Sequence, residues 1–203
     1  MKQLAIFSSG AGSNAARIID HFHGHPTITV SLVVCNKPGA GVIGIAERAG
    51  IPVLMIEKET FFRGGAYVAE LQERKIDLLV LAGFLWKIPA ALVTAYRGRI
   101  VNIHPALLPK YGGKGMYGRY VHEAVVAAKE QETGITIHYV DELYDHGQSI
   151  FQARVLVEAG DTPETLARKV QQLEHEHFPR IIEEVANSAH RDHGGQGNLQ
   201  NHR

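Results

Sequence analysis

Short apolar segments alternate with helical ones along most of the chain, and this alternation constrains the fold more than any other feature. Strand-like runs, rich in apolar and β-branched residues, occupy residues 4–7, 27–35, 53–56, 77–82 and 99–104. Helical patterns separate the first four runs at residues 13–23, 42–49 and 61–74, the last weakened by Gly64 and Gly65. Because parallel strands need helical crossovers, the sequence predicts a Rossmann-like, doubly wound, mostly parallel α/β sheet with helices on both faces.

The later part of the chain no longer alternates strands with helices. Residues 135–140 and 149–157 are strand-like runs with no long helical pattern between them, which indicates a late antiparallel strand. A long helix then begins after Thr162, the expected N-cap, with Pro163 in its first turn. From Asn187 the composition is polar and lacks apolar periodicity. We therefore expect one domain over residues 1–186 and a disordered tail over residues 187–203.

Composition narrows the class of protein. The 203 residues suit one domain, and 21 Lys and Arg balance 21 Asp and Glu, so the formal net charge is zero. This balance argues against a broad basic surface for nucleic acid and against a polybasic membrane anchor. Cys35 is the one cysteine of the sequence, which fits a reducing compartment. There is no signal-peptide pattern and no apolar run long enough to span a bilayer, so we expect a cytoplasmic protein.

A glycine-rich turn lies between the first strand and the first helix. The sequence Gly10–Ala15 reads GAGSNA, and such a turn lets a phosphate approach the backbone N–H groups at the helix start. The same pattern satisfies the dinucleotide fingerprint, which also needs a carboxylate at the end of the second strand. That strand ends in Cys35, Asn36 and Lys37, with no carboxylate. A phosphate site is favoured, while Lys37 leaves an NADP-type dinucleotide-binding protein open as an alternative.

Asn102 and His104 point to the same face of a predicted strand, because side chains alternate along a strand. Pro105 ends the strand, so both lie at its carboxyl end, where open α/β sheets bind ligands. An amide and an imidazole there could flank one reacting group, or could be a hydrogen-bonded pair without a catalytic role. Asp145, in the loop of residues 141–147, could pair with a histidine and raise its pKa, or lie in a solvated turn.

Several other histidines invite a metal interpretation. The groups at positions 21, 23 and 25 and at positions 175 and 177 lack the spacing of helical zinc sites. We expect these histidines to lie on a solvated surface, and we expect no metal site. His138 lies on a late strand, where a structural hydrogen bond is favoured.

Several motifs occur together in one order: SGAGSN at residues 9–14, LAGF at 81–84, VNIHPALLPKY at 101–111, GITIHYV at 134–140 and DHGQ at 145–148. In this order they resemble the folate-dependent formyltransferases, and the early GSN turn is similar to the glycinamide ribonucleotide branch of that family. The resemblance covers about residues 2–186. It implies the formyltransferase fold and transfer of the formyl group of 10-formyltetrahydrofolate to the amine of glycinamide ribonucleotide, in purine synthesis.

The resemblance also implies roles for individual residues. The family's catalytic trio corresponds to Asn102, His104 and Asp145. Its ribonucleotide site corresponds to Gly12, Ser13, Asn14 and, in a Q-x-x-E-H motif, Glu174. Its folate site corresponds to Arg63, Leu85, Trp86, Lys87, Ile88, Asn102, Val140, Asp141 and Glu142.

In the reaction that the resemblance implies, Asn102 and protonated His104 would hold the formyl oxygen while the amine attacks the formyl carbon. Asp145 would keep His104 cationic near neutral pH. No metal is needed, and the expected partners are small-molecule substrates rather than nucleic acid or membrane. The protein is expected to be a monomer or a homodimer.

The sequence differs from the family pattern in two segments, and two other enzyme families share the catalytic trio. Trp86 and Lys87 replace a segment in which many members carry an arginine, and Gly112–Gly118 replaces a P-G-x-H-x-H segment, so that Lys114 could serve an anionic substrate. Formyltetrahydrofolate hydrolase shares the trio but carries a further N-terminal domain. Methionyl-tRNA formyltransferase carries a further C-terminal domain. Neither extra domain is expected here.

Overall fold

The computed structural model describes residues 1–63 and 65–188. The strands are β1 (Lys2–Ser8), β2 (Ile28–Cys35), β3 (Val53–Met55), β4 (Leu78–Leu81), β5 (Ile100–His104), β6 (Glu132–Tyr139) and β7 (Ser149–Leu156). The helices are α1 (Ser13–Phe22), α2 (Gly41–Arg48), α3 (Lys58–Arg63), α4 (Ala66–Glu73), α5 (Ala90–Ala95), α6 (Arg119–Ala127) and α7 (Pro163–Ser188).

The strands form one sheet in the order β3-β2-β1-β4-β5-β6-β7. Strands β1 to β5 pair in parallel, and β6 and β7 are added antiparallel at one edge. This confirms the predicted α/β fold and its late antiparallel strands. The strand order reverses between β1 and β4, the position at which sheets of this type bind ligands beyond their carboxyl ends.

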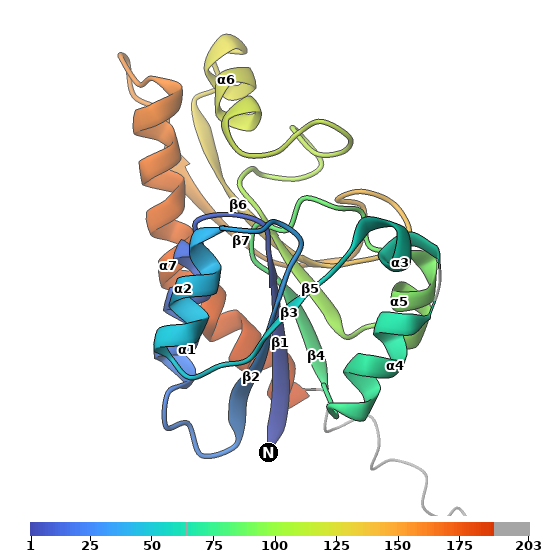
Figure 1. Cartoon of the computed structure of the whole chain (residues 1–203). Coiled ribbons are helices and arrows are strands. Elements are labelled where there is room, and N and C mark those ends of the chain that lie inside the picture. Colours follow the sequence, from blue (N-terminus) through green and yellow to red (C-terminus); the bar gives the residue numbers. More distant parts are fainter. Residues whose placement is uncertain (64, 189–203) are drawn as a thin grey trace, which may run out of the picture.

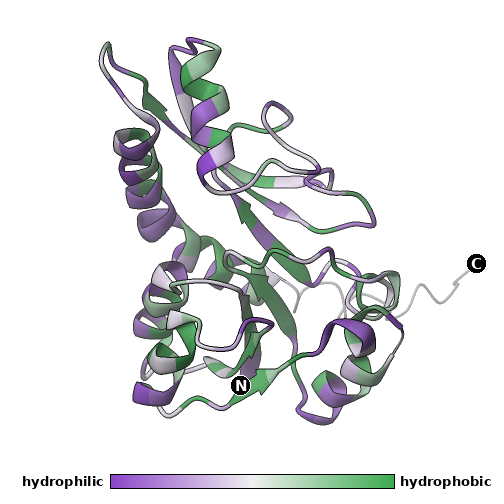
Figure 2. Cartoon of the chain, turned by 45° about the horizontal axis from the view of Figure 1, so that its top comes forward, coloured by the Kyte–Doolittle hydropathy of each residue, from purple (hydrophilic) through white to green (hydrophobic). Residues whose placement is uncertain are grey.

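Two apolar cores lie on opposite faces of the sheet. Neighbouring residues of β1 face opposite ways, so Ile6 packs with residues of α1, α2 and α7, whereas Phe7 packs with residues of α4 and α5. Figure 1 shows the first group of helices on one side of the sheet and α3, α4 and α5 on the other. Figure 2 shows the matching pattern of hydropathy, with apolar strands in the middle and polar residues on the outer helices. Burial on both faces explains why the central strands are continuously apolar.

The helix predicted over residues 61–74 is two helices: α3 ends at Arg63, and α4 begins at Ala66 with Gly65 as its N-cap. Gly64 lies outside the described residues. The sequence analysis missed α5 and α6, which have six and nine residues and too few turns to show a clear period.

The last helix, α7, begins as predicted. The Thr165 N–H donates to Thr162 Oγ1 at 3.2 Å, which makes Thr162 the N-cap. The helix continues to Ser188, two residues into the predicted tail, and residues 189–203 of that tail lie outside the described part. Disorder of the tail therefore stays a prediction. Within residues 1–63 and 65–188, no helix is both long and apolar enough to cross a membrane.

Candidate active site

A cavity of about 1050 Å³ lies beyond the carboxyl ends of β4 and β5. Its lining brings together residues that are far apart in the sequence: Asn14 of α1, Leu85 after β4, Asn102 and His104 of β5, Asp145 after β6, and Glu174 of α7. The structure therefore joins the predicted catalytic trio with part of the predicted ribonucleotide site in one cavity.

His104 is buried, with 4% of its surface exposed, at the end of β5. Its Nε2–H donates to the main-chain oxygen of Tyr111 at 2.7 Å, which fixes the proton of the neutral ring on Nε2. The other ring nitrogen, Nδ1, lies 3.5 Å from Asp145 Oδ2. The pairing of His104 with Asp145 that the sequence left open is thus present in the structure.

Asp145 is held from several sides. Its Oδ2 accepts a hydrogen bond from the Gly113 N–H at 2.9 Å, and its Oδ1 lies 3.7 Å from His138 Nε2. Its own φ is 52°, a left-handed conformation that an aspartate tolerates better than most residues. The carboxylate therefore lies between two imidazoles rather than in a solvated turn.

His138 is the neighbour that the sequence analysis assigned only a structural hydrogen bond. It is 2% exposed, and its Nδ1–H donates to the Tyr139 oxygen at 2.8 Å. Its Nε2 then accepts from Asn102 Nδ2 at 3.1 Å, across the antiparallel pair that β5 and β6 form. The hydrogen bond is confirmed, but its partner is a residue of the trio, so His138 orients the Asn102 amide.

The pKa of His104 is shifted in the direction opposite to the one expected from the sequence. Burial lowers the pKa of His104, and the Asp145 carboxylate, which raises it, does not compensate. The lowered pKa runs against the expectation that Asp145 keeps His104 cationic near neutral pH, because the sequence does not reveal the burial. Burial also raises the pKa of Asp145, but the neighbouring imidazoles of His138 and His104 and the Gly113 N–H together hold it below its usual range.

The glycine-rich turn has the predicted form. Gly12 is the N-cap of α1 with φ 81°, and a Cβ on it would lie 2.8 Å from Val42 Cα, so only glycine fits. Ser13 Oγ accepts from Gln171 Nε2 of α7 at 3.1 Å. The start of α1 therefore contacts the middle of α7.

Asn14 links this turn to the cavity. Its Nδ2 donates to Glu174 Oε2 at 2.8 Å, and burial raises the pKa of Glu174. Asn14 Oδ1 is buried and has no hydrogen-bond partner among the described residues. The predicted ribonucleotide residues Gly12, Ser13, Asn14 and Glu174 thus form one contiguous group, with an unused acceptor at the cavity.

The predicted folate residues are more scattered. Leu85 and Asn102 line the main cavity, and the Leu85 N–H donates to Ser9 Oγ at 3.0 Å. Trp86 packs against the rings of Phe61, Phe62 and Phe84. These aromatic contacts place Trp86 beside the cavity lining rather than in it.

The remaining predicted folate residues do not line the main cavity. Ile88 is buried in the core, and Lys87 Nζ lies 5.7 Å from the centre of the Tyr144 ring. Arg63 pairs with Glu59 on α3, and Glu142 pairs with Arg97. The Val140 N–H donates to the oxygen of Ile100 at the start of β5, and Asp141 Oδ1 accepts from the nearby Leu143 N–H.

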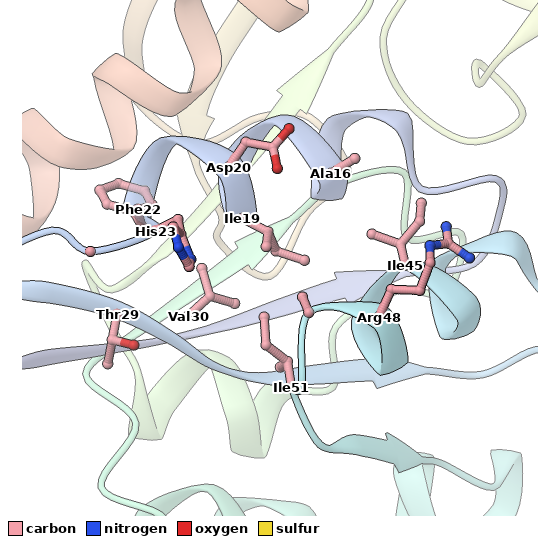
Figure 3. A pocket seen from close by; sticks show the side chains of 12 residues that line it. Ala16, Ile19, Asp20, Phe22, His23, Thr29, Val30, Ile45, Arg48 and Ile51 are labelled. Carbon is pink, nitrogen blue, oxygen red and sulfur yellow. The ribbon is translucent and has the colours of Figure 1, made fainter.

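A second cavity, of about 640 Å³, lies between α1, β2 and α2. Figure 3 shows the apolar side chains of Ile19, Val30, Ile45 and Ile51 around it, with the carboxylate of Asp20 on the outer side of α1. It contains none of the trio, so the main cavity is the better candidate for chemistry. In the described ranges 1–63 and 65–188, no three His, Cys, Asp or Glu side chains are grouped as metal ligands.

Comparison with known proteins decides the family. A model of the formyl transferase family matches residues 2–182. The chain belongs to the formyl transferase family. This confirms the resemblance seen in the motifs and supports it over the alternative of an NADP-type dinucleotide-binding protein.

The chain is similar to several proteins that are named phosphoribosylglycinamide formyltransferase. The one from Bacillus subtilis (strain 168) is 35% identical over 190 residues, covering 91% of this chain and 95% of the relative. The chloroplastic one from Arabidopsis thaliana is 42% identical over 187 residues, covering 89% of this chain and 64% of the relative. The chain thus spans less than two thirds of the plant relatives' length. A crystal structure of the Bacillus halodurans protein superposes with a TM-score of 0.80 and 39% identity, covering 98% of both chains.

Three contacts of the trio were not found from the sequence: those of Tyr111, Gly113 and His138. Tyr111 and Gly113 act through main-chain atoms, which leave no side-chain signature. His138 pairs with Asn102 in the register between β5 and β6, and only knowledge of that register could have indicated the contact.

Proposed function

We propose that this protein transfers the formyl group of 10-formyltetrahydrofolate to the primary amine of glycinamide ribonucleotide, in purine biosynthesis. The observation that carries the proposal is the meeting of Asn102, His104 and Asp145 in one cavity with Asn14 and Glu174. Relatives with the phosphoribosylglycinamide formyltransferase name support the same activity.

Gly12, Ser13 and Asn14 are proposed to bind the ribonucleotide phosphate. The N–H groups at the start of α1 are open to an anion, because the N-cap is a glycine without a side-chain cap. Glu174, next to Asn14, would accept hydrogen bonds from the ribose hydroxyls. This arrangement directs the amine of the substrate toward the trio.

The chemistry moves one formyl group. A bond forms between the amine nitrogen and the formyl carbon, the bond from that carbon to the folate nitrogen breaks, and one proton passes from the amine to the leaving folate nitrogen. Negative charge develops on the formyl oxygen in between. The Asn102 amide, oriented by His138, is suited to donate a hydrogen bond to that oxygen.

His104 is proposed to carry the proton. Burial lowers its pKa, which favours the neutral ring before reaction, and the hydrogen bond to Tyr111 keeps the proton of that ring on Nε2. Nδ1 then carries no proton and can accept one from the attacking amine, and the Asp145 carboxylate, 3.5 Å away, stabilises the imidazolium that results. The same imidazolium can return the proton to the folate nitrogen.

The folate is proposed to bind Leu85 at the cavity and residues beside the cavity: Arg63, Trp86, Lys87, Ile88, Val140, Asp141 and Glu142. Trp86 lies in an aromatic cluster next to the lining residue Phe84, which suits a flat ring system. We propose 10-formyltetrahydrofolate as the donor.

A formyltetrahydrofolate hydrolase is the close alternative. It would pass the formyl group to water and would have no need for a ribonucleotide site. The pairing of Asn14 with Glu174 and the glycine N-cap of α1 favour the transferase. The cytoplasmic location, and a monomer or homodimer acting on small molecules alone, are proposed on the sequence argument above.

The assay measures loss of formyl-folate absorbance with glycinamide ribonucleotide, with water alone and with methionyl-tRNA as acceptor. Turnover that depends on the ribonucleotide is expected. Equal turnover without it would establish the hydrolase, and turnover only with methionyl-tRNA would refute the proposed acceptor.

A further inference from the structure

A glycine-rich loop, Gly112–Gly118, leads from the β5 end to α6 and lines the main cavity with Gly113, Lys114, Met116 and Tyr117. The Gly113 N–H is bound by Asp145 Oδ2 at 2.9 Å, and the Met116 N–H donates to the Gly113 oxygen at 3.1 Å. These bonds close a turn that contains Lys114. The residues on either side of Lys114, Gly113 and Gly115, have φ angles of 94° and 88°. Glycine adopts such positive φ angles without strain, which allows the chain to turn at Lys114.

The other end of the loop leads into α6, at the top of Figure 1. The ring of Tyr117 meets that of Tyr120 edge to face, with 5.4 Å between their centres. The loop is therefore held at the catalytic carboxylate and at a helix. Lys114 stands between these two anchors, one residue from the Gly113 contact to Asp145.

The charged residues that line the cavity are Lys114, Arg119, Glu123, Asp145 and Glu174. Arg119 is already paired with Glu123 and lies 3.7 Å from Glu164. Among the residues that the structure describes, ion pairs are formed by Arg119 and by Lys110 but not by Lys114. Among these lining residues it is the cation available to a ligand.

We propose that Lys114 binds the phosphate of the ribonucleotide, opposite the turn at the start of α1. A phosphate monoester carries about 1.5 to 2 negative charges at pH 7, and the ammonium group of a lysine at the cavity can pair with it. Asn14 and Glu174 line the same cavity, whereas most of the proposed folate residues lie outside it. The inference rests on the proposed function for the identity of the ribonucleotide.

The first test compares Lys114→Ala and Lys114→Gln with Lys110→Ala. Lys110 is a matched control because it pairs with Glu130 at 2.8 Å and does not line the main cavity. The Lys114 variants are expected to raise the KM for glycinamide ribonucleotide about 10- to 100-fold, the range for one hydrogen bond to a charged group, and to leave the KM for folate nearly unchanged. Lys114→Arg should retain most of the affinity.

The second test uses binding rather than turnover. Calorimetry measures the Kd of ribose 5-phosphate and of ribose for the wild-type protein and the same variants. The Lys114 variants should weaken binding of the phosphate ester and have no effect on ribose.

Two results would overturn the inference: equal Kd values of ribose 5-phosphate for wild type and Lys114→Ala, or a rise in the KM for folate instead of the ribonucleotide. Lys114-dependent binding of ribose 5-phosphate in a protein that transfers no formyl group would instead refute the proposed function and retain the inference. Thermal unfolding of each variant shows whether Lys114→Ala folds, and Lys114→Gln repeats the test if it does not.

Discussion

Asp145→Asn isolates the charge of one carboxylate. An asparagine at this position keeps an oxygen that can accept the Gly113 N–H, so the loop anchor is retained. What is lost is the negative charge 3.5 Å from His104 Nδ1, which stabilises the imidazolium formed during reaction. General acid–base contributions are typically about 10²- to 10⁴-fold, and we expect kcat to fall in that range, about 3–5 kcal/mol of activation free energy. The KM values should change little.

The variant should also change how kcat depends on pH, and the direction of that change can be derived. Neutral His104 accepts the proton, so kcat falls as the pH drops through the pKa of His104 in the complex. Asp145 raises that pKa, and its removal lets burial lower the pKa further. The acidic limb of the kcat profile should therefore move to lower pH in Asp145→Asn.

The assay is steady-state kcat from pH 5 to pH 9, with an NMR titration of the His104 ring. Asp20→Asn, on α1 and outside the main cavity, is the control for a lost aspartate charge. Because His104 and Asp145 act as a unit, the double variant with His104→Ala should cost little more than the worse single variant. Additive losses, or an acidic limb that does not move, would refute the reasoning.

Three further predictions concern the phosphate turn, the last helix and the folate end. Gly12→Val should raise the KM for glycinamide ribonucleotide far more than that for folate, because its Cβ would lie 2.8 Å from Val42 Cα and distort the turn; equal effects on both KM values would indicate general misfolding. Asp161 has its pKa lowered to about 2, chiefly by the Lys169 ammonium group that it contacts at 2.7 Å. Its contribution to stability is present above its unfolded pKa of about 3.9 and is lost as the pH falls toward 2, so urea unfolding between pH 5 and pH 2 should show a steeper loss for wild type than for Asp161→Asn. Folate analogues should quench the fluorescence of Trp86, the one tryptophan of the sequence, and a saturating titration with no change would remove the folate assignment from that cluster.

The parallel sheet was predictable because its central strands are buried on both faces and are continuously apolar. Asn102 and His104 were predictable because strand alternation and Pro105 place them together at a carboxyl end. The helices α5 and α6 were not predictable, since each has six to nine residues and its apolar face is defined by tertiary packing. The same holds for the glycine-rich loop, whose turn depends on a contact with Asp145 across 32 residues of sequence.

The electrostatics of the site could not be read from residue types. Pairing with a carboxylate predicts a raised pKa for His104, whereas its burial at the end of β5 reverses the direction. His138 was identified as hydrogen-bonded, but its role toward Asn102 depends on the register of β5 and β6. Arg63 matched a family position, yet it pairs with Glu59 and is largely exposed on α3.

The central claim is that the cavity containing Asn102, His104 and Asp145 passes a formyl group to the amine of glycinamide ribonucleotide. The most direct measurement follows a ¹³C label on the formyl carbon of 10-formyltetrahydrofolate by NMR, in the presence of protein and ribonucleotide. We predict that the label appears in the formamide of the ribonucleotide product and that His104→Ala slows this step by orders of magnitude. Label that appears in formate at the same rate with and without the ribonucleotide would contradict the account.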